Sequence, residues 1–186
     1  QGSAYVKKLR KAYPEIPGMA DFCVYWFNRS AEHLATCQQK NWYAGRAGLV
    51  GTQNIRSNAS RVGGLDVICT TGTILEAVDN QPWSGEANVN VSIANWVKSH
   101  DASLIPVKKR LWQKIKSSAP KVRKPRGTGQ ASKEFELDTR LVDHINASLS
   151  DKIDLGGTFK LKCNDDVVVC QGITPGHDGF LIKTPQ

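Results

Sequence analysis

Residues 44–99 read AGRAGLVGTQNIRSNASRVGGLDVICTTGTILEAVDNQPWSGEANVNVSIANWVKS, and this stretch decides the fold that we predict. It contains two short apolar runs, 47–51 and 74–78, which are bounded by glycines and turn-forming residues and are typical of buried strands. Residues 87–97 then alternate between apolar and polar side chains, and a period of two over that length predicts a strand. Residues 55–70 leave room for a helix. The pattern is therefore a strand, a helix, and two strands joined by a loop that carries a tryptophan.

Two segments of this stretch are specific in their wording: GLVGTQNIR at 48–56 and GTILEAVDNQPWSGEANVNVSIANWVK at 72–98. Over most of residues 20–99 the chain resembles the C-terminal half of the catalytic domain of adenine-N6 DNA methyltransferases, as found in large bacterial type II restriction-modification polypeptides. In that family the first segment follows the fifth strand and the second forms the last two strands. The resemblance implies an α/β fold, namely the C-terminal half of a Rossmann-like, S-adenosylmethionine-dependent methyltransferase sheet with its last three strands and two helices.

A weaker resemblance, to the target-recognition domain that follows in this family, covers residues 143–182 and rests on HINASLS and CQGITPGHDGFLI. We therefore predict three parts. Residues 1–105 form the C-terminal part of the catalytic domain, 106–133 a basic linker, and 134–186 the beginning of a small, partial α+β recognition module.

The predicted linker contains ten lysines and arginines and no acidic residue. Its apolar residues Leu111, Trp112 and Ile115 predict that it begins as a short helix. A run of one charge is usually a solvated segment. Between a methyltransferase half and a recognition module, however, such a run is suited to DNA phosphates.

Composition points in the same direction. The 186 residues carry a formal charge of +8 and the pI is about 9.3, so the surface attracts polyanions, most plausibly nucleic acid. Five cysteines without a CxxC pair exclude a disulfide framework and a cysteine zinc site. We expect a reducing bacterial cytoplasm, no metal, and no membrane partner, because no run is long enough to span a bilayer.

Two motifs of the resembling family are missing from the sequence. These enzymes carry an (Asp/Asn)-Pro-Pro-(Tyr/Phe) loop for the target amine and a glycine-rich loop for the cofactor. This chain has no two adjacent prolines, and its Gly127-Thr128-Gly129 lies in a Pro/Lys-rich stretch rather than after a strand. We expect a fragment of a site-specific adenine methyltransferase, inactive alone, that needs the upstream remainder of the polypeptide.

An aromatic-rich segment, 19–37, predicts a helix with its apolar residues at spacings near three, four and seven. The simpler interpretation is a stripe that faces the core. In the resembling family one aromatic of this helix lines the adenine pocket of S-adenosylmethionine, which is the cofactor that the resemblance implies. By position Trp26 is the best candidate and Phe22 the next.

Polar residues follow the first predicted strand, where open α/β sheets place their ligands. Arg56, Ser60 and Arg61 are candidates for DNA phosphate contacts, with an ordinary helix cap as the alternative. Two further groups are candidates for binding double-stranded DNA. They are Lys121, Arg123, Lys124 and Arg126 in the linker, and Gln171, Thr174 and His177, which carry groups able to read base edges or simply to form a loop.

Trp83 lies in the loop between the last two predicted strands, beside Pro82 and Gly85. A target adenine must leave the duplex to meet the methyl donor, and an extruded base needs an aromatic surface on which to stack. In related enzymes an aromatic just before the last strand does this. The alternative is a tryptophan that closes the core over the hairpin.

The leading hypothesis is thus a fragment of an adenine-N6 DNA methyltransferase, which transfers a methyl group from S-adenosylmethionine to an extruded adenine. The fragment would supply the sheet edge, the base-stacking loop and DNA contacts. The alternative is a non-catalytic DNA-binding or specificity module. A third class, a nuclease, is not supported, because the sequence has no Asp…Glu-x-Lys cluster on a predicted strand. A sheet without its first strands exposes an edge, which permits a homodimer through that edge.

Overall fold

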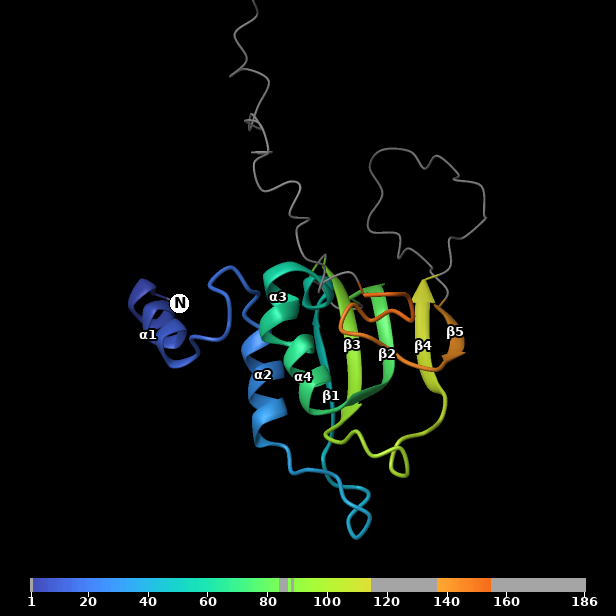
Figure 1. Ribbon diagram of the computed structural model, residues 1–186. Coiled ribbons are helices and arrows are strands. Elements are labelled where there is room, and N and C mark those ends of the chain that lie inside the picture. Colours follow the sequence, from blue (N-terminus) through green and yellow to red (C-terminus); the bar gives the residue numbers. More distant parts are fainter. Residues whose placement is uncertain (1, 84–86, 88, 115–136, 155–186) are drawn as a thin grey trace, which may run out of the picture. The chain divides into compact units, whose positions relative to one another are not determined.

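The computed structural model describes residues 2–83, 87, 89–114 and 137–154, which all belong to one compact unit, Gln1–Asp154 (Figure 1). The α/β class predicted from the sequence is confirmed. The helical elements are α1 Ser3–Ala12, α2 Val24–His33, the 3-10 helix η1 Gln53–Arg56, α3 Asn58–Gly63 and α4 Leu65–Thr71. Within the described part of the chain, each helix is too short or too polar to cross a bilayer.

The five strands form one mixed sheet in the order β1-β3-β2-β4-β5. Their bounds are β1 Arg46–Thr52, β2 Thr73–Pro82, β3 Asn90–Val97, β4 Lys109–Lys114 and β5 Leu137–Val142. Strand β3 lies between β1 and β2 and runs antiparallel to both, so β1 and β2 are parallel to each other. Strand β4 is parallel to β2, and β5 is antiparallel to β4. The predicted sequence of strand, helix and two strands is confirmed.

Strand β1 is an edge strand and is not fully buried, contrary to the expectation from its apolar run. Val50 is 46% exposed, because it points away from the helices, whereas Leu49 packs partly against the core. At Gly48 a Cβ would meet the side-chain Oδ1 of Asn95, its partner on β3. At Gly51 a Cβ would lie 2.7 Å from the Ile55 side chain and 3.0 Å from the Phe27 ring, so this glycine permits close packing of β1 against η1 and α2.

The short helix expected at the start of the linker is wrong, because residues 109–114 form strand β4. Leu111 is fully buried and lies opposite Ala77 of β2, while the Trp112 indole Nε1 donates a 2.7 Å hydrogen bond to Glu76 Oε1. These partners are more than thirty residues away, so local charge and helix propensity were overridden by sheet pairing. Strand β4 comes from the predicted linker and β5 from the predicted recognition module, yet both belong to this sheet.

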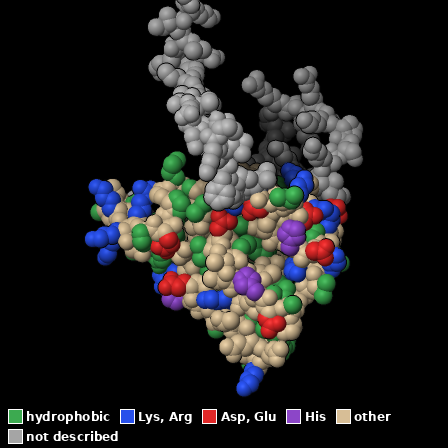
Figure 2. Space-filling view, in the orientation of Figure 1, with side chains coloured by type: hydrophobic (Ala, Val, Ile, Leu, Met, Phe, Trp, Pro, Cys, Tyr) green, Lys and Arg blue, Asp and Glu red, His purple; other side chains and the backbone are tan. Residues whose placement is uncertain are grey.

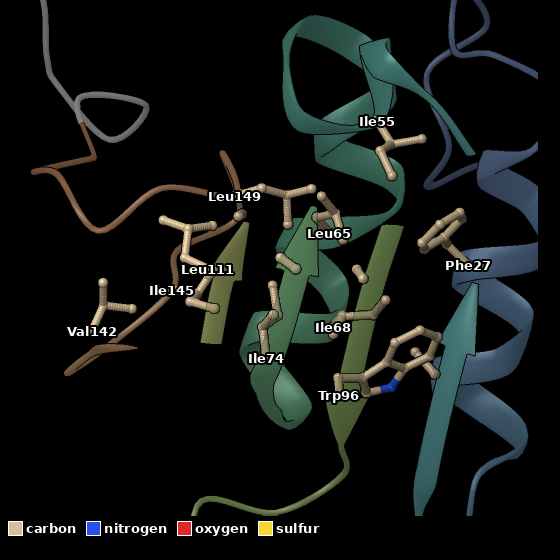
Figure 3. Close-up of a cluster of buried hydrophobic side chains, with 14 residues drawn as sticks. Phe27, Ile55, Leu65, Ile68, Ile74, Trp96, Leu111, Val142, Ile145 and Leu149 are labelled. Carbon is tan, nitrogen blue, oxygen red and sulfur yellow. The ribbon is translucent and has the colours of Figure 1, made fainter. Parts of the chain in front are cut away.

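The core lies on the face of the sheet that α2, η1 and α4 cover (Figure 3). Phe27 of α2 stacks on Trp96 of β3, with ring centroids 6.1 Å apart, and both side chains are buried. On the other side of α4, Ile145 and Leu149 of the segment 143–154 complete the same cluster. Each such buried side chain contributes roughly 1.5–3 kcal/mol, so this segment is an integral part of the unit.

Replacing Leu111 with alanine tests whether β4 is part of the core. The Leu111→Ala variant should lose about 2–5 kcal/mol of unfolding free energy, since it leaves a cavity at a fully buried position. The matched control is Leu141→Ala on β5, where the leucine is 67% exposed and the loss should stay within roughly 0.5 kcal/mol. Urea unfolding measures both. Equal, small losses would mean that residues 109–114 are a linker outside the folded unit.

Candidate functional site

The carboxyl ends of the parallel strands β1, β2 and β4 meet at one edge of the sheet. Thr52, the last residue of β1, lies opposite Val91, and Pro82, the last residue of β2, lies opposite Asn90. Only β3 separates the two chain exits, so they are about 9–10 Å apart, which is twice the spacing between strands. Open α/β sheets bind ligands outside the carboxyl ends of their strands. We call this end of the sheet, with the residues that follow β1 and β2, the carboxyl edge. It is the end at which these strands finish, and is distinct from the outer side of the edge strand β1.

Asp21 ties the loop before α2 to the carboxyl edge. Its carboxylate accepts hydrogen bonds from the Thr52 hydroxyl and from Asn54 Nδ2, the latter at 3.2 Å. Its backbone N–H donates to Ser60 Oγ at 2.9 Å. Ser60 is consequently 4% exposed and already has a partner within the protein. The phosphate contact proposed for Ser60 stays a prediction, and its burial disfavours it.

Arg61 joins two segments that are far apart in the sequence. Its guanidinium forms ion pairs with Asp66 at 3.0 Å and Asp154 at 2.9 Å, and Nη1 also donates to Ser148 Oγ at 2.8 Å. Desolvation lowers the pKa of Arg61, but the hydrogen bonds and charges of the two carboxylates outweigh it and raise that pKa. Arg61 is therefore a permanent cation whose partners are internal, and it holds segment 143–154 against α3.

Arg56 differs from Arg61 in its surroundings. Arg56 is the last residue of η1, directly after β1, and is half-buried. Its guanidinium makes no hydrogen bond or ion pair with another described residue. Among Arg56, Ser60 and Arg61, it alone keeps its polar group open for an anion at this edge. The DNA contact predicted for it remains a prediction that the geometry permits.

Trp83 is not a core residue. It follows β2 at the carboxyl edge, it is 45% exposed, and its backbone N–H donates to the Val89 carbonyl at 2.9 Å. The core tryptophan is Trp96, which is 2% exposed. The alternative in which Trp83 closes the core over the hairpin is therefore wrong for the described structure. Its position in the chain is directly after β2, at the end of the sheet where β1 also ends.

The aromatic stripe expected on α2 is split between the core and the surface. Phe27 is buried as expected, but Trp26 is 58% exposed and Phe22, which precedes α2, is 47% exposed. Phe22 contacts Tyr25, with ring centroids 5.8 Å apart, and is the direct neighbour of Asp21. Helix α2 itself is shorter than the predicted 19–37 and spans Val24–His33, and the Asp21 carboxylate before it bonds to Thr52 and Asn54.

The remaining site predictions lie outside the described residues. They concern Lys121, Arg123, Lys124, Arg126, Gln171, Thr174 and His177. Within the described ranges, no group of histidine, cysteine and acidic side chains is arranged to hold a metal ion. A hollow of about 540 Å³ lies elsewhere, between α1 and α2, and includes Tyr13, Asn28 and Lys98 in its lining but none of the predicted site residues.

Sequence reasoning missed the partners that build this edge. The Asp21 partners Thr52 and Asn54 are 31 and 33 residues away in sequence, and no local pattern pairs them with it. The Arg61 partners carried no local signal either, because Ser148 and Asp154 are 87 and 93 residues away in sequence.

Comparison with known proteins gives a likeness in fold. No protein-family model and no curated protein matches the sequence. Among solved structures, the chain is similar to part of the Type IIL restriction-modification enzyme MmeI, whose structure is a complex with DNA. The TM-score is 0.57 and the sequence identity 16%, over 83% of this chain. The matched part is 18% of the MmeI chain, so this chain spans under a fifth of that enzyme. At this identity the likeness establishes a shared fold.

Removing the Arg61 charge tests its role in holding segment 143–154. The Arg61→Met variant keeps most of the side-chain volume but removes the cation that pairs with Asp66 and Asp154, so it should cost about 1–3 kcal/mol. Hydrogen exchange should become faster at the amides of Asn146 and Leu149, which are bonded within that segment. Arg56→Met is the matched control and should leave those amides unchanged. Equal protection in both variants would show that the ion pairs do not hold the segment.

Proposed function

We propose that this chain is the C-terminal half of the catalytic domain of a restriction-modification adenine-N6 DNA methyltransferase. The observation that carries the proposal is the arrangement of the last strands. Strand β3 is inserted antiparallel between two parallel strands, and an exposed Trp83 follows β2 at the edge where β1 ends. The shared fold with a segment of a restriction-modification enzyme supports it, as does the resemblance in sequence wording.

In this proposal Trp83 stacks on the extruded adenine. Trp83 is 45% exposed, so part of its surface is open to a base, and the Trp83–Val89 backbone hydrogen bond anchors the residue where β2 ends. Stacking of a base on an aromatic side chain contributes roughly 1–3 kcal/mol. The neighbouring exit of β1, one strand away, is where open α/β sheets bind their ligands.

The cofactor in this proposal is S-adenosylmethionine, which supplies the electrophilic methyl group when bound. Phe22 and Trp26 would form one wall of its adenine pocket. Both are aromatic and exposed, and Trp26 lies on α2 while Phe22 directly precedes that helix. Asp21 holds this wall at the carboxyl edge through Thr52 and Asn54. The glycine-rich loop and the catalytic loop would come from the upstream remainder of the polypeptide.

Double-stranded DNA is the proposed partner. Arg56 is the open cation at the carboxyl edge, and the basic residues 121–126 and the polar residues 171–177 would add phosphate and base contacts. The outer edge of β1 pairs with no other described strand, so it is where an upstream strand of the same polypeptide would add. A second copy of the chain would use the same edge to form a homodimer. A bacterial cytoplasm is the setting that the proposal implies.

A non-catalytic DNA-binding or specificity module is the second candidate. The formal charge of +8 favours it. In that function the sheet is a scaffold and Trp83 has no catalytic part, so the two candidates differ in what Trp83 does.

The experiment replaces Trp83 in the longer enzyme. Trp83→Ala should lower methyl transfer by about 5- to 150-fold, which corresponds to the loss of roughly 1–3 kcal/mol of stacking. Trp83→Phe should keep much of the rate, because a phenyl ring still offers a face. A base analogue that fluoresces when unstacked, placed at the target position, reports extrusion directly.

The matched control is Trp42→Ala. Trp42 is similarly exposed, at 64%, but it lies before β1, at the opposite end of the strand. It should change neither signal. If Trp83→Ala and Trp42→Ala have the same small effect on a folded enzyme, Trp83 does not stack on the base.

A further inference from the structure

Helix α1 stands apart from the rest of the described unit (Figure 1). None of its residues is buried. It is attached by its C-terminal end, where Leu9 and Tyr13 pack against Ile16, Val24 and Tyr25. Arg10 reinforces this attachment by donating from Nη2 to the Gly18 carbonyl at 2.6 Å. The apolar side of α1 is therefore in use, and the opposite side faces solvent.

Three lysines occupy that opposite side. At 100° per residue, Val6, Leu9 and Tyr13 form one stripe of the helix, and Lys7, Lys8 and Lys11 lie on the other side. Each lysine is exposed, and none forms an ion pair with another described residue. The space-filling view shows basic side chains gathered over α1 (Figure 2).

This arrangement is costly for an isolated helix. Lys7 and Lys11 are four residues apart and repel each other by roughly 0.2–0.5 kcal/mol, and no acidic residue lies in the first turn to offset them. A ten-residue helix is also marginal in water, because helices shorter than about 12–15 residues gain little without packing. A polyanion that binds the lysines would relieve the repulsion and stabilise the helix.

We propose that α1 is a DNA-backbone contact, in which Lys7, Lys8 and Lys11 bind phosphates of duplex DNA without regard to sequence. This rests on the proposed function in that DNA is the partner, but it assigns a surface separate from the carboxyl edge and from the basic residues 121–126. Lys7 and Lys11 are separated by about 6 Å along the helix axis. Phosphates of one DNA strand follow each other every 3.4 Å or so of duplex axis, so the two ammonium groups engage different phosphates.

A membrane surface fits α1 less well. Helices that lie on bilayers bury a broad apolar face below their lysines. In α1 the apolar stripe is short, and Leu9 and Tyr13 already pack on the protein. Charge without a free apolar face suits a nucleic-acid backbone.

The experiment measures binding of the full chain to a random-sequence duplex over a range of salt concentrations. The Lys7→Ala/Lys8→Ala/Lys11→Ala variant should reduce the slope of log K against log salt by about 0.9 per lost phosphate contact, or about 2.7 for three. Alanine favours helix at least as well as lysine, so a loss of binding is not a loss of helix. Replacing the same three lysines with arginine should keep the slope.

The matched control removes three exposed basic side chains elsewhere, Arg29, Lys40 and Lys152, and should leave the slope close to that of the unaltered chain. DNA should also slow hydrogen exchange in α1 of the unaltered chain. If the unaltered chain binds DNA and the triple-alanine variant of α1 has the same slope, the inference fails and the proposed function stands. Preference for anionic vesicles over duplex DNA at the same salt concentration also contradicts the inference. If the unaltered chain binds no DNA at all, both the inference and the other DNA contacts proposed for this chain fail.

Discussion

The placement of β3 between β1 and β2 is the constraint on which the rest of the structure depends. It is hydrogen-bonded on both sides, to β1 and to β2, and its Ala94 and Trp96 face the helices and are buried. Because β3 runs against both neighbours, the exits of β1 and β2 meet at one edge with a single strand between them. That geometry places Trp83, after β2, and Thr52, which Asp21 contacts at the end of β1, at the same end of the sheet.

Two polar connections then fix what surrounds this edge. Asp21 joins the loop before α2 to the end of β1, and Arg61 joins α3 to segment 143–154. Both connections link segments that are distant in sequence, and they occupy the Asp21 carboxylate, the Ser60 hydroxyl and the Arg61 guanidinium. The side chains near this edge therefore fall into two groups. Ser60 and Arg61 build the scaffold, whereas Arg56, Trp83 and the aromatic side chains of Phe22 and Trp26 stay open to a partner.

The strands that carry the edge could be predicted from the sequence because their signal is local. Alternation in 87–97 and glycine-bounded apolar runs report a strand without reference to any partner. Strand β4 could not be found in this way, since Leu111 lies in a run of lysines and arginines and its cross-strand partners, Ala77 and Arg140, are far away in the sequence. The exposure of the aromatic side chains could not be predicted from the sequence either. Helical spacing placed Trp26 on the same stripe as Phe27, yet Trp26 is 58% exposed whereas Phe27 is buried.

The most direct test of the account is the transfer of a labelled methyl group from S-adenosylmethionine to duplex DNA. The measurement compares this chain with a longer polypeptide that adds an upstream catalytic loop and glycine-rich loop, and it identifies the methylated base by digestion. The account predicts N6-methyladenine from the longer polypeptide and no product from the 186-residue chain alone. Turnover by the chain alone, or a longer polypeptide that binds DNA but methylates no adenine, would contradict it.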